Sequence, residues 1–468
     1  MTLIKSISGI RGTVGGFPGE GLTPLDVVKF TSGYAFWVKE KFPEFQPSVV
    51  VGRDGRLSGA LLQGIVANTL AACGLRVLLL DYTTTPSVEM AVKGLRAQGG
   101  IILTASHNPI EWNALKLLNA EGEFVSAENG ARILELSESP RIEFPAWQHL
   151  GVIETHPGGY IREHVEAILK HPLVNPAAVA AANFRVVVDA INSTGGLAVP
   201  LLLEALGVRE VEVLNATPMG HFAHNPEPLA EHLQEVCKKV KENGAHLGIV
   251  VDPDVDRLAF IQEDGVMFGE ENTLVAVARY YLKHRPGPVV NNLSSSRALR
   301  DVASALGCTT HSAPVGEVHV VARMKETGAV LGGEGNGGVI VPELHYGRDA
   351  LAGIALMLTS LALEKKSLSA LRQELPQYEM AKKKVTLPPG LSADGLLRAL
   401  SAHYSDYPQN HEDGLKVDFP RGWLHIRKSN TEPIVRIYSE APSRTEAEQL
   451  AADCMHYVDE LKENALSL

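Results

Sequence analysis

Three aspartates alternate in the segment DPDVDR, residues 252–257. In an extended segment, residues two apart point to the same side, so we expect Asp252, Asp254 and Asp256 to face one another. Carboxylates so placed repel unless a cation lies among them, and hard oxygen ligands suit Mg²⁺, which often also takes phosphate oxygens. Arg257 could hold such a phosphate through two hydrogen bonds. A solvated acidic turn is the alternative, but three aspartates after an apolar strand favour a magnesium site.

Ser106 lies in TASHNP, residues 104–109, directly after the apolar run Ile101-Ile102-Leu103. A serine hydroxyl is a poor nucleophile until a base or metal assists it. Its phosphorylated form carries two negative charges and three acceptor oxygens, enough to supply a magnesium ligand. A turn-forming serine explains the segment equally well. His107 alone is more often a hydrogen-bonded structural histidine than an acid–base group.

Two basic residues are further candidates. Lys116, ten residues after Ser106, is an ordinary solvated loop lysine unless a phosphoserine lies beside it. There it could neutralise charge or, with a lowered pKa, transfer protons. Arg11 lies in GIRGT, residues 9–13, whose glycines let the backbone approach a ligand closely.

Two more polar segments could bind a phosphorylated sugar. Glu334 and Asn336 lie in the glycine-rich run GGEGNGG, residues 332–338, where a carboxylate could accept from sugar hydroxyls. A flexible turn is the alternative. The segment RKSNTEP, residues 427–433, with Arg436 beyond it, combines arginines, hydroxyls and backbone amides into a phosphate clamp, whereas a polar hairpin loop is the alternative.

These segments follow predicted strands. Thr23-Pro24 predicts a helix start, and the apolar runs predict strands at 49–51, 77–80, 101–103, 186–189, 247–251 and 329–331. Helices are expected near 229–243 and 350–365, and strands at 423–427 and 435–438 precede a C-terminal helix. Alternating helices and strands predict an α/β fold with an α+β tail. Ligands bind beyond the carboxyl ends of strands in open α/β sheets, which is where three of the polar segments fall.

Length, net charge and cysteine content limit the class of protein. A chain of 468 residues exceeds the roughly 250–300 that one core holds, so several domains are expected. The net charge of −11 argues against nucleic-acid binding but not against an anionic substrate. The four cysteines form no CxxC pair, and no run reaches the ~18 apolar residues of a membrane span. With no signal-peptide pattern, we expect a cytoplasmic protein that does not contact a membrane.

Together the segments GIRGT, TASHNP, DPDVDR, GEGNGG and RKSNTEP resemble the α-D-phosphohexomutase superfamily over nearly the whole chain. The resemblance implies three related mixed α/β domains and a C-terminal α+β domain around a central cleft. We place these at 1–150 with the serine loop, 151–263 with the metal loop, 264–372 with the sugar loop and 373–468 with the phosphate loop.

The resemblance also implies roles. Ser106 would be the phosphoserine and would bind Mg²⁺ with Asp252, Asp254 and Asp256. The reacting end would be lined by Arg11, His107, Lys116 and Arg257. The sugar would contact Glu334 and Asn336, and its distal phosphate would be bound by Arg427, Ser429, Asn430, Thr431 and Arg436. A hexose 1,6-bisphosphate would be the intermediate and activator.

Two departures from the family pattern matter. Many members read GExSGH where this chain has Asn336 and Gly338, so the general base is open, and Asn430 replaces a common glycine. The GEGNGG and RKSNTEP forms look most like an archaeal-type phosphoglucosamine mutase group. Glucosamine phosphate is therefore the first substrate, with phosphomannomutase or phosphoglucomutase activity as the alternative and a monomer or homodimer expected. More distant alternatives are a phosphatase with Asp252 as nucleophile and a non-catalytic phosphosugar-binding protein.

Overall fold

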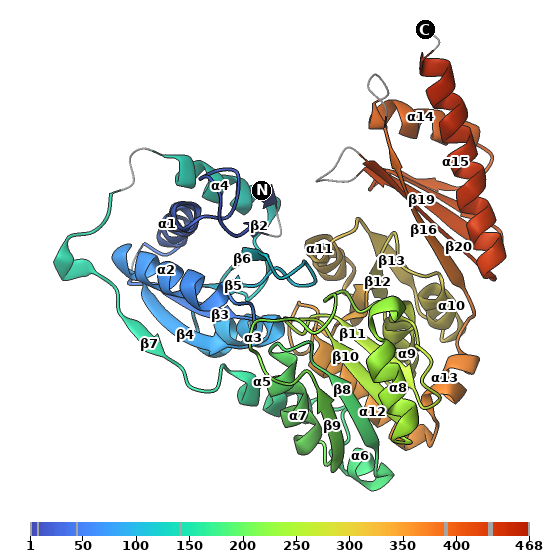
Figure 1. Ribbon diagram of the computed structural model, residues 1–468, viewed down its shortest axis with the longest axis horizontal. Coiled ribbons are helices and arrows are strands. Elements are labelled where there is room, and N and C mark those ends of the chain that lie inside the picture. The colour runs from blue at the N-terminus through green and yellow to red at the C-terminus, as the bar shows by residue number, and fades with distance from the viewer. Residues whose placement is uncertain are drawn as a thin grey trace. The chain divides into compact units, whose positions relative to one another are not determined.

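The computed structural model describes residues 2–6, 9–43, 45–139, 143–387, 392–428 and 434–466. The chain divides into two compact units, traced from blue to red in Figure 1. The first unit comprises Met1–His284 and Asn336–Arg372, and the second comprises Arg285–Gly335 and Gln373–Leu468. The chain thus leaves the first unit at residue 285, returns at 336 and leaves again at 373.

The N-terminal part of the first unit contains a mixed sheet. Over the described residues its strand order is β1-β2-β6-β5-β3-β4-β7. The strands are β1 (Leu3–Ser6), β2 (Gly9–Thr13), β3 (Ser48–Arg53), β4 (Arg76–Tyr82), β5 (Gly99–Leu103), β6 (Trp112–Leu118) and β7 (Ile153–Thr155). Strands β3, β4, β5 and β7 run parallel where they pair, whereas β6 pairs antiparallel with β2 and β5. The accompanying helices are α1 (Pro24–Lys41), α2 (Gly59–Ala72), α3 (Thr85–Gly94), α4 (Ala127–Glu138) and η1 (Trp147–His149).

Alternating side chains of β3 explain why helices cover both faces of this sheet. Val49 and Val51 join the apolar cluster of α1, α2 and α4, whereas Val50 joins the cluster of α3. The two helix layers are visible in Figure 1. Helix α1 begins where the sequence predicts, because Thr23 at the N-cap and Asp26 in the first turn form a reciprocal capping box.

A second sheet follows in the same unit, with the order β11-β10-β8-β9 in the described part of the chain. Its strands are β8 (Arg185–Asp189), β9 (Glu210–Leu214), β10 (Leu247–Val251) and β11 (Leu258–Gln262). Strand β8 pairs parallel with β9 and β10, and β11 pairs antiparallel with β10. The helices of this region are α5 (Ile161–Lys170), α6 (Pro176–Ala182), α7 (Gly195–Ala205), η2 (Ala230–His232) and α8 (Gln234–Glu242).

The rest of the first unit centres on one buried helix. Helix α12 (Ala350–Glu364) is buried along most of its length and contacts α5, α6 and α9 (Glu270–His284). Its uniformly apolar surface, rather than one apolar stripe, fits a helix surrounded by protein. Strand β15 (Gly338–Ile340) precedes it, and α13 (Leu368–Glu374) follows.

The second unit combines a parallel sheet with an antiparallel one. Strand β12 (Val289–Asn292) pairs parallel with β13 (Thr310–Ala313) and β14 (Leu331–Glu334), and α10 (Ala298–Ala305) and α11 (Glu317–Thr327) accompany them. The antiparallel sheet has the order β16-β20-β19-β18-β17 among described residues. Its elements are β16 (Glu379–Thr386), β17 (Gln409–Asn410), β18 (Leu415–Phe419), β19 (Gly422–Lys428), β20 (Ile434–Ala441), α14 (Ala393–His403) and α15 (Arg444–Leu466).

The predicted α/β fold with an α+β tail is confirmed, with two local corrections. The strand expected at 329–331 begins only at Leu331, and it includes Gly332 and Glu334, which were expected in a loop. Pairing of Leu331 and Gly332 with β12 extends the strand into the glycine-rich run. The helix expected near 229–243 is also shorter, because η2 precedes α8. The domain boundaries at 150, 263 and 372 stay a prediction.

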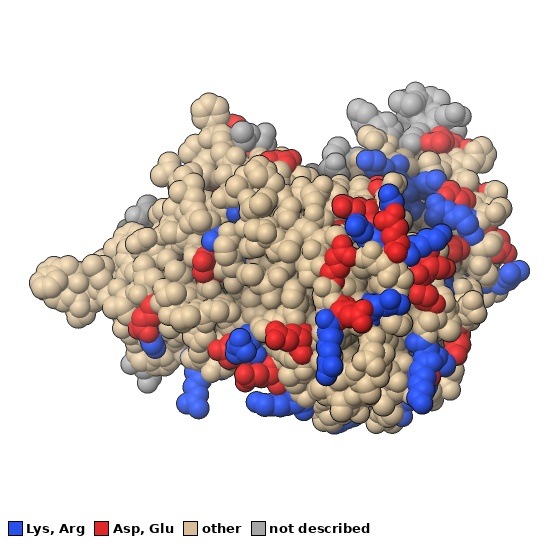
Figure 2. Space-filling model, turned by 60° about the horizontal axis from the view of Figure 1, so that its bottom comes forward, with Lys and Arg blue, Asp and Glu red and all other residues tan. Residues whose placement is uncertain are grey.

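Charges on the face shown in Figure 2 are mixed in sign. Lysine and arginine side chains lie among aspartates and glutamates, so opposite charges neutralise each other locally. Among the described helices, none combines the length and the apolar character that crossing a membrane requires.

Candidate active site

The segment after β5 holds Ser106 in an unusual backbone conformation. Its φ of +50° lies in the left-handed region, and its N–H donates to Thr104 Oγ1 at 2.9 Å. The buried Ser106 hydroxyl donates to Asp252 Oδ2 at 2.8 Å. His107 Nδ1 lies 3.4 Å from the same Oγ. The serine and histidine of TASHNP therefore meet the first aspartate of DPDVDR.

The aspartate loop, residues 252–256, follows the carboxyl end of β10. It is a turn rather than the extended segment expected, because Val255 has a φ of +63°. Neighbouring helix starts hold this turn: Thr85 N–H donates to Asp254 O, and Ala350 N–H donates to Val255 O. The carboxylates still converge, since one oxygen from each aspartate lies within 4.8 Å of the others. All three side chains are buried.

Besides the contact of Ser106 with Asp252 Oδ2, protein donors hold one oxygen of each aspartate. Asp252 Oδ1 accepts from the backbone N–H groups of Asp256 and Arg257, both at 3.1 Å. Asp254 Oδ2 accepts from Thr85 Oγ1 at 2.6 Å and from Lys116 Nζ at 2.7 Å. Asp256 Oδ2 accepts from an arginine that the sequence did not single out, Arg348, at 2.6 Å.

The remaining oxygens fit a cation. Asp254 Oδ1 and Asp256 Oδ1 are buried and accept no hydrogen bond from the described residues. Burial and the charges of Asp256 and Asp254 raise the pKa of Asp252 well above its usual value. Carboxylate oxygens are the hard ligands that Mg²⁺ takes, so Asp252, Asp254 and Asp256 could hold such an ion.

Basic residues surround the serine and the aspartates. Burial, followed by the charges of Arg257, Arg348 and Arg11, lowers the pKa of His107 well below its usual value. Burial and Arg257 also lower the pKa of Arg11. The expected group of Arg11, His107 and Arg257 is therefore close enough to interact electrostatically, and Arg348 belongs to it.

Lys116 differs from expectation in two ways. It lies in β6 and is buried, not on a loop. Burial favours the neutral amine, but the carboxylates of Asp254 and Asp256 outweigh it and raise the pKa of Lys116. Lys116 is thus held as an ammonium ion in this state, rather than poised to give up its proton.

Arg56 is a residue that sequence reasoning missed. Its Nε donates to Asp54 Oδ2, and its Nη atoms donate to the carbonyl oxygens of residues 106, 108, 109 and 112 at 2.6–2.9 Å. Asp54 Oδ2 also accepts from Thr104 Oγ1 at 2.7 Å. Arg56 and Asp54 together fix both sides of the serine loop. The available signal was the polar run GRDGR, residues 52–56, at the end of β3.

The two residues predicted to contact the sugar fall in different units, Glu334 in the second and Asn336 in the first. Glu334, at the end of β14, is buried and accepts from Asn292 Nδ2 at 2.8 Å and Gly316 N–H at 3.1 Å. Asn336, which belongs to the first unit, accepts from Gly338 N–H through Oδ1 at 3.2 Å. That Glu334 and Asn336 contact a sugar stays a prediction.

Two arginines face each other in the antiparallel sheet. Arg427 in β19 is the direct cross-strand partner of Arg436 in β20, so both side chains point to one face. Like charges in this position are destabilising on their own, which favours an anion between them. Ser429, Asn430 and Thr431 lie outside the described residues.

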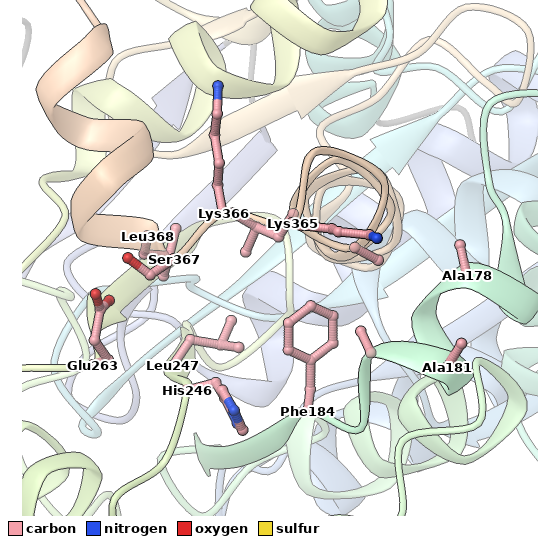
Figure 3. Close-up of a pocket in the computed structure, with 13 residues that line it drawn as sticks. Ala178, Ala181, Phe184, His246, Leu247, Glu263, Lys365, Lys366, Ser367 and Leu368 are labelled. Carbon is pink, nitrogen blue, oxygen red and sulfur yellow. The ribbon is translucent and has the colours of Figure 1, made fainter.

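A pocket of about 510 Å³ lies elsewhere in the first unit, lined by α6, the start of β10 and the end of α12. Figure 3 shows Phe184, His246 and Lys365 around it. Asp252 follows the end of β10, whereas Leu247 at its start lines this pocket. The pocket therefore lies at the opposite edge of the sheet and shares no residue with the aspartate loop.

Comparison with known proteins shows the family of this chain. Four family models described as phosphoglucomutase/phosphomannomutase match the chain: α/β/α domain I at 3–141, domain II at 162–265, domain III at 270–378 and the C-terminal domain at 381–456. The fold and these matches define a phosphohexomutase, an isomerase-class enzyme that transfers a phosphoryl group within its substrate. The chain belongs to the phosphoglucomutase/phosphomannomutase family, as its resemblance to the α-D-phosphohexomutase superfamily predicts.

Relatives match over almost the full length. A Thermococcus kodakarensis protein named phosphoglucomutase/phosphomannomutase is 36% identical over 442 residues, covering 94% of this chain and 96% of that one. A Sulfurisphaera tokodaii phosphoglucosamine/phosphogalactosamine mutase is 31% identical, covering 96% and 98%. The crystal structure of a family protein from Burkholderia thailandensis superposes with a TM-score of 0.84 at 28% identity, covering 98% of both chains.

Proposed function

We propose that this chain interconverts glucosamine 6-phosphate and glucosamine 1-phosphate through a phosphate carried on Ser106, with Mg²⁺ held by Asp252, Asp254 and Asp256. The observation that carries the proposal is the 2.8 Å contact between Ser106 Oγ and Asp252 Oδ2. A phosphoryl group on that oxygen would lie beside the aspartates, where it could supply a further metal ligand. A bound Mg²⁺ would neutralise charge on the transferring group.

The reaction needs two transfers. In the first, the bond between phosphorus and Ser106 Oγ breaks and a bond to the free sugar hydroxyl forms, giving a hexose 1,6-bisphosphate. The sugar hydroxyl gives up its proton to a base in the site, and Ser106 Oγ takes up a proton as the leaving oxygen; His107 Nδ1, 3.4 Å from that oxygen, lies within reach to exchange this proton. In the second transfer, the bond between the other phosphate and the sugar oxygen breaks and a bond from that phosphate to Ser106 Oγ forms, while Oγ gives up its proton and the sugar oxygen takes one up. Arg11, Arg257 and Lys116 would stabilise the anionic group in both steps.

Binding of the distal phosphate must tolerate either end of the bisphosphate, because the intermediate turns over between transfers. We assign this role to Arg427 and Arg436 with Ser429, Asn430 and Thr431, and sugar recognition to Glu334 and Asn336. The facing arginines support the assignment, since charge recognises a phosphate at either position of the ring.

The sugar substrate is assigned from the GEGNGG and RKSNTEP segments and from the name of one relative. The Sulfurisphaera tokodaii protein is named for phosphorylated glucosamine and galactosamine, which supports a hexosamine. The Thermococcus kodakarensis name supports glucose or mannose phosphates as the alternative. Comparing kcat/KM for the 6-phosphates and 1-phosphates of glucosamine, N-acetylglucosamine, glucose and mannose separates these choices. Four unpaired thiols support a cytoplasmic location, and a monomer or homodimer stays a prediction.

The phosphoserine is tested by mass. We expect intact mass and peptide mapping to find phosphate on Ser106 after treatment with a hexose bisphosphate. Ser106→Ala should lose this phosphate and nearly all turnover while keeping the thermal unfolding midpoint of the wild type. Phosphate found instead on Asp252, with turnover retained in Ser106→Ala, would show a phosphatase-like aspartyl nucleophile.

The metal assignment has its own test. Asp254→Asn should lower Mg²⁺-supported kcat by at least ~100-fold, because an amide is a weaker ligand than a carboxylate and Lys116 loses the nearer of its two carboxylate partners. Steady-state kinetics over a Mg²⁺ titration would measure this. Wild-type rates in a folded variant would remove the aspartates from the metal site.

A further inference from the structure

Arg348 approaches the metal loop from the segment between β15 and α12. Its Nη2 donates to Asp256 Oδ2 at 2.6 Å, and the two side chains are 10% and 0% exposed. The contact joins residues that are far apart in the sequence, so neither residue type nor spacing indicated it. An arginine in this position neutralises Asp256 and also fixes which of its oxygens remains available.

The side chain of Arg348 passes directly beside the Cα of Gly338. A Cβ atom at 338 would overlap Arg348 Cδ and lie 2.9 Å from Cγ. Gly338 is not among the residues with positive φ, so its backbone does not require glycine. Glycine is therefore needed at 338 for steric reasons, because the aliphatic part of Arg348 occupies the space that any side chain there would need.

The backbone of Arg348 is held on both sides. An antiparallel bridge pairs it with Ile340 in β15. The next residue, Asp349, accepts from the N–H groups of Leu351 and Ala352 through Oδ1 and from His164 Nε2 through Oδ2 at 2.8 Å. Arg348 is thus directed at Asp256 from a fixed position. A residue that orients a metal-ligating side chain must itself be fixed in this way.

The restraint on Asp256 has counterparts at the other two aspartates. Backbone amides hold one oxygen of Asp252, Thr85 and Lys116 hold one of Asp254, and Arg348 holds one of Asp256. Asp254 and Asp256 are each left with one oxygen that accepts no hydrogen bond from the described residues, while the other oxygen of Asp252 accepts from Ser106 Oγ. One-oxygen ligation suits the strict octahedral geometry of Mg²⁺, whereas Ca²⁺ readily takes both oxygens of a carboxylate and more ligands in total.

We propose that Arg348 restricts Asp256 to one-oxygen coordination and thereby makes the aspartate loop select Mg²⁺ over Ca²⁺, and that Gly338 is needed because a side chain there would displace Arg348. This inference rests on the proposed metal site and adds a positioning residue to it. Removing a positive charge changes the affinity for both divalent ions alike. The ratio of their dissociation constants therefore reports the geometry of the carboxylate rather than the charge of the arginine.

The test measures this ratio, Kd(Ca²⁺)/Kd(Mg²⁺), by calorimetry on the full chain with Ser106 phosphate occupancy matched by intact mass. Arg348→Met should lower the ratio about tenfold. Gly338→Ala, which keeps the charge but displaces the side chain, should lower it similarly. In an Arg348→Ala background, Gly338→Ala should add no further change, because the atoms it collides with are gone.

Matched controls exist for both substitutions. Arg279→Met removes a similarly covered arginine that pairs with Glu364 at 2.9 Å, away from the aspartates. Gly64→Ala places a Cβ where no neighbouring atom lies within 4 Å. Both should keep the wild-type ratio.

A ratio within twofold of wild type in either Arg348→Met or Gly338→Ala would overturn the inference, as would additive effects of the two positions. If Arg348→Met does not fold, Gly338→Ala decides alone. Wild-type protein that binds neither ion would instead remove the metal site itself and the proposed function with it. Magnesium binding and turnover in the wild type with unchanged selectivity in the variants would remove only this inference.

Discussion

At the scale of single residues, the conformation of Ser106 depends on the buried side chain of Arg56. Arg56 is buried, and its donors reach Asp54 and four carbonyl groups around the Ser106 loop. Ser106 itself has a positive φ, which for a serine is held only by surrounding contacts. The planar fork of an arginine can satisfy several carbonyls at once, whereas a lysine has three donors on one atom.

Arg56→Lys should therefore damage both stability and catalysis. Carbonyl groups left buried without donors cost about 1–3 kcal/mol each, so we expect a loss of roughly 3 kcal/mol in the free energy of unfolding. The kcat should fall by about 100-fold, since misplaced reacting atoms cost this much, while KM changes less. Urea unfolding and steady-state kinetics measure the two effects.

Arg53→Lys is the matched control for Arg56→Lys. Arg53 is also buried, but it pairs with the half-exposed Asp81 at 2.7 Å. Its replacement should cost less than ~1 kcal/mol and leave kcat near that of the wild type. Equal effects of the two substitutions would mean that Arg56 acts only as a general structural arginine.

The sequence was informative about residues whose surroundings are local. Ser106 and the three aspartates follow apolar strands directly, so pattern alone placed them at strand ends. Arg348 could not be found this way, because it acts on Asp256, a residue distant in sequence, and for Arg56 the run GRDGR after β3 was a signal that did not indicate its partner, the loop of Ser106. The turn at Val255 was missed because a β-branched residue gives no signal for a positive φ.

At the scale of elements, a buried ionic cluster joins three segments of the first unit. Asp349 at the start of α12 accepts from His164 of α5, and His345 lies 3.3 Å from Asp349 and 3.0 Å from Glu89 of α3. Burial alone would lower the pKa of His345, but the two carboxylates outweigh it and raise that pKa to about 10. His345 is thus a cation between two anions.

Stability should depend on pH through this histidine. Its pKa is raised from 6.5 to about 10 on folding, so the folded state binds the proton more tightly. The stabilisation is fully present below pH 6.5 and is lost as pH rises towards 10. We expect the free energy of unfolding to fall over that window in the wild type, as measured by urea unfolding at several pH values.

His345→Gln is the comparison that isolates this effect. Burial lowers the pKa of Lys416 to about 8, and this lysine contributes with the opposite sign in the same window. The quantity to follow is therefore the difference between wild type and variant, which should shrink as pH rises. A difference that is constant from pH 6.5 to 10 would contradict the raised pKa.

Element boundaries were predictable where packing and pattern agree. Strands β5 and β10 end where their apolar runs end, and α12 spans almost the expected range. The glycine-rich run before β15 was misjudged, since Gly332 pairs in β14 and propensity does not foresee a partner strand. Local pattern gives the type of an element, while its end depends on its neighbours.

At the scale of the whole chain, the second unit joins two distant segments through buried polar contacts. Arg297, beside α10, donates to Asp418, Phe419 O and Gly422 O, and its N–H donates to Glu440 Oε1 at 2.9 Å. Trp423 Nε1 donates to the same Glu440 oxygen at 2.7 Å. These contacts tie 285–335 to the C-terminal sheet.

Arg297→Met should loosen both segments together. Removing one partner of a buried charged network costs about 3–5 kcal/mol. Amide hydrogen exchange should therefore accelerate at least ~100-fold in β12 and in β19 alike. Arg300→Met is the control, because Arg300 lies 3.9 Å from the same Asp418 but is half exposed. Acceleration confined to one segment would show that the two do not open as a unit.

The cluster around Asp349 also bears on how the protein is made. Glu89 and His164 emerge from the ribosome long before His345 and Asp349, their partners in the folded unit. At ~5–20 residues per second, the delay lasts tens of seconds. During that interval the nascent α3 and α5 must keep a carboxylate and an imidazole hydrated, so their final docking waits until translation has passed residue 349.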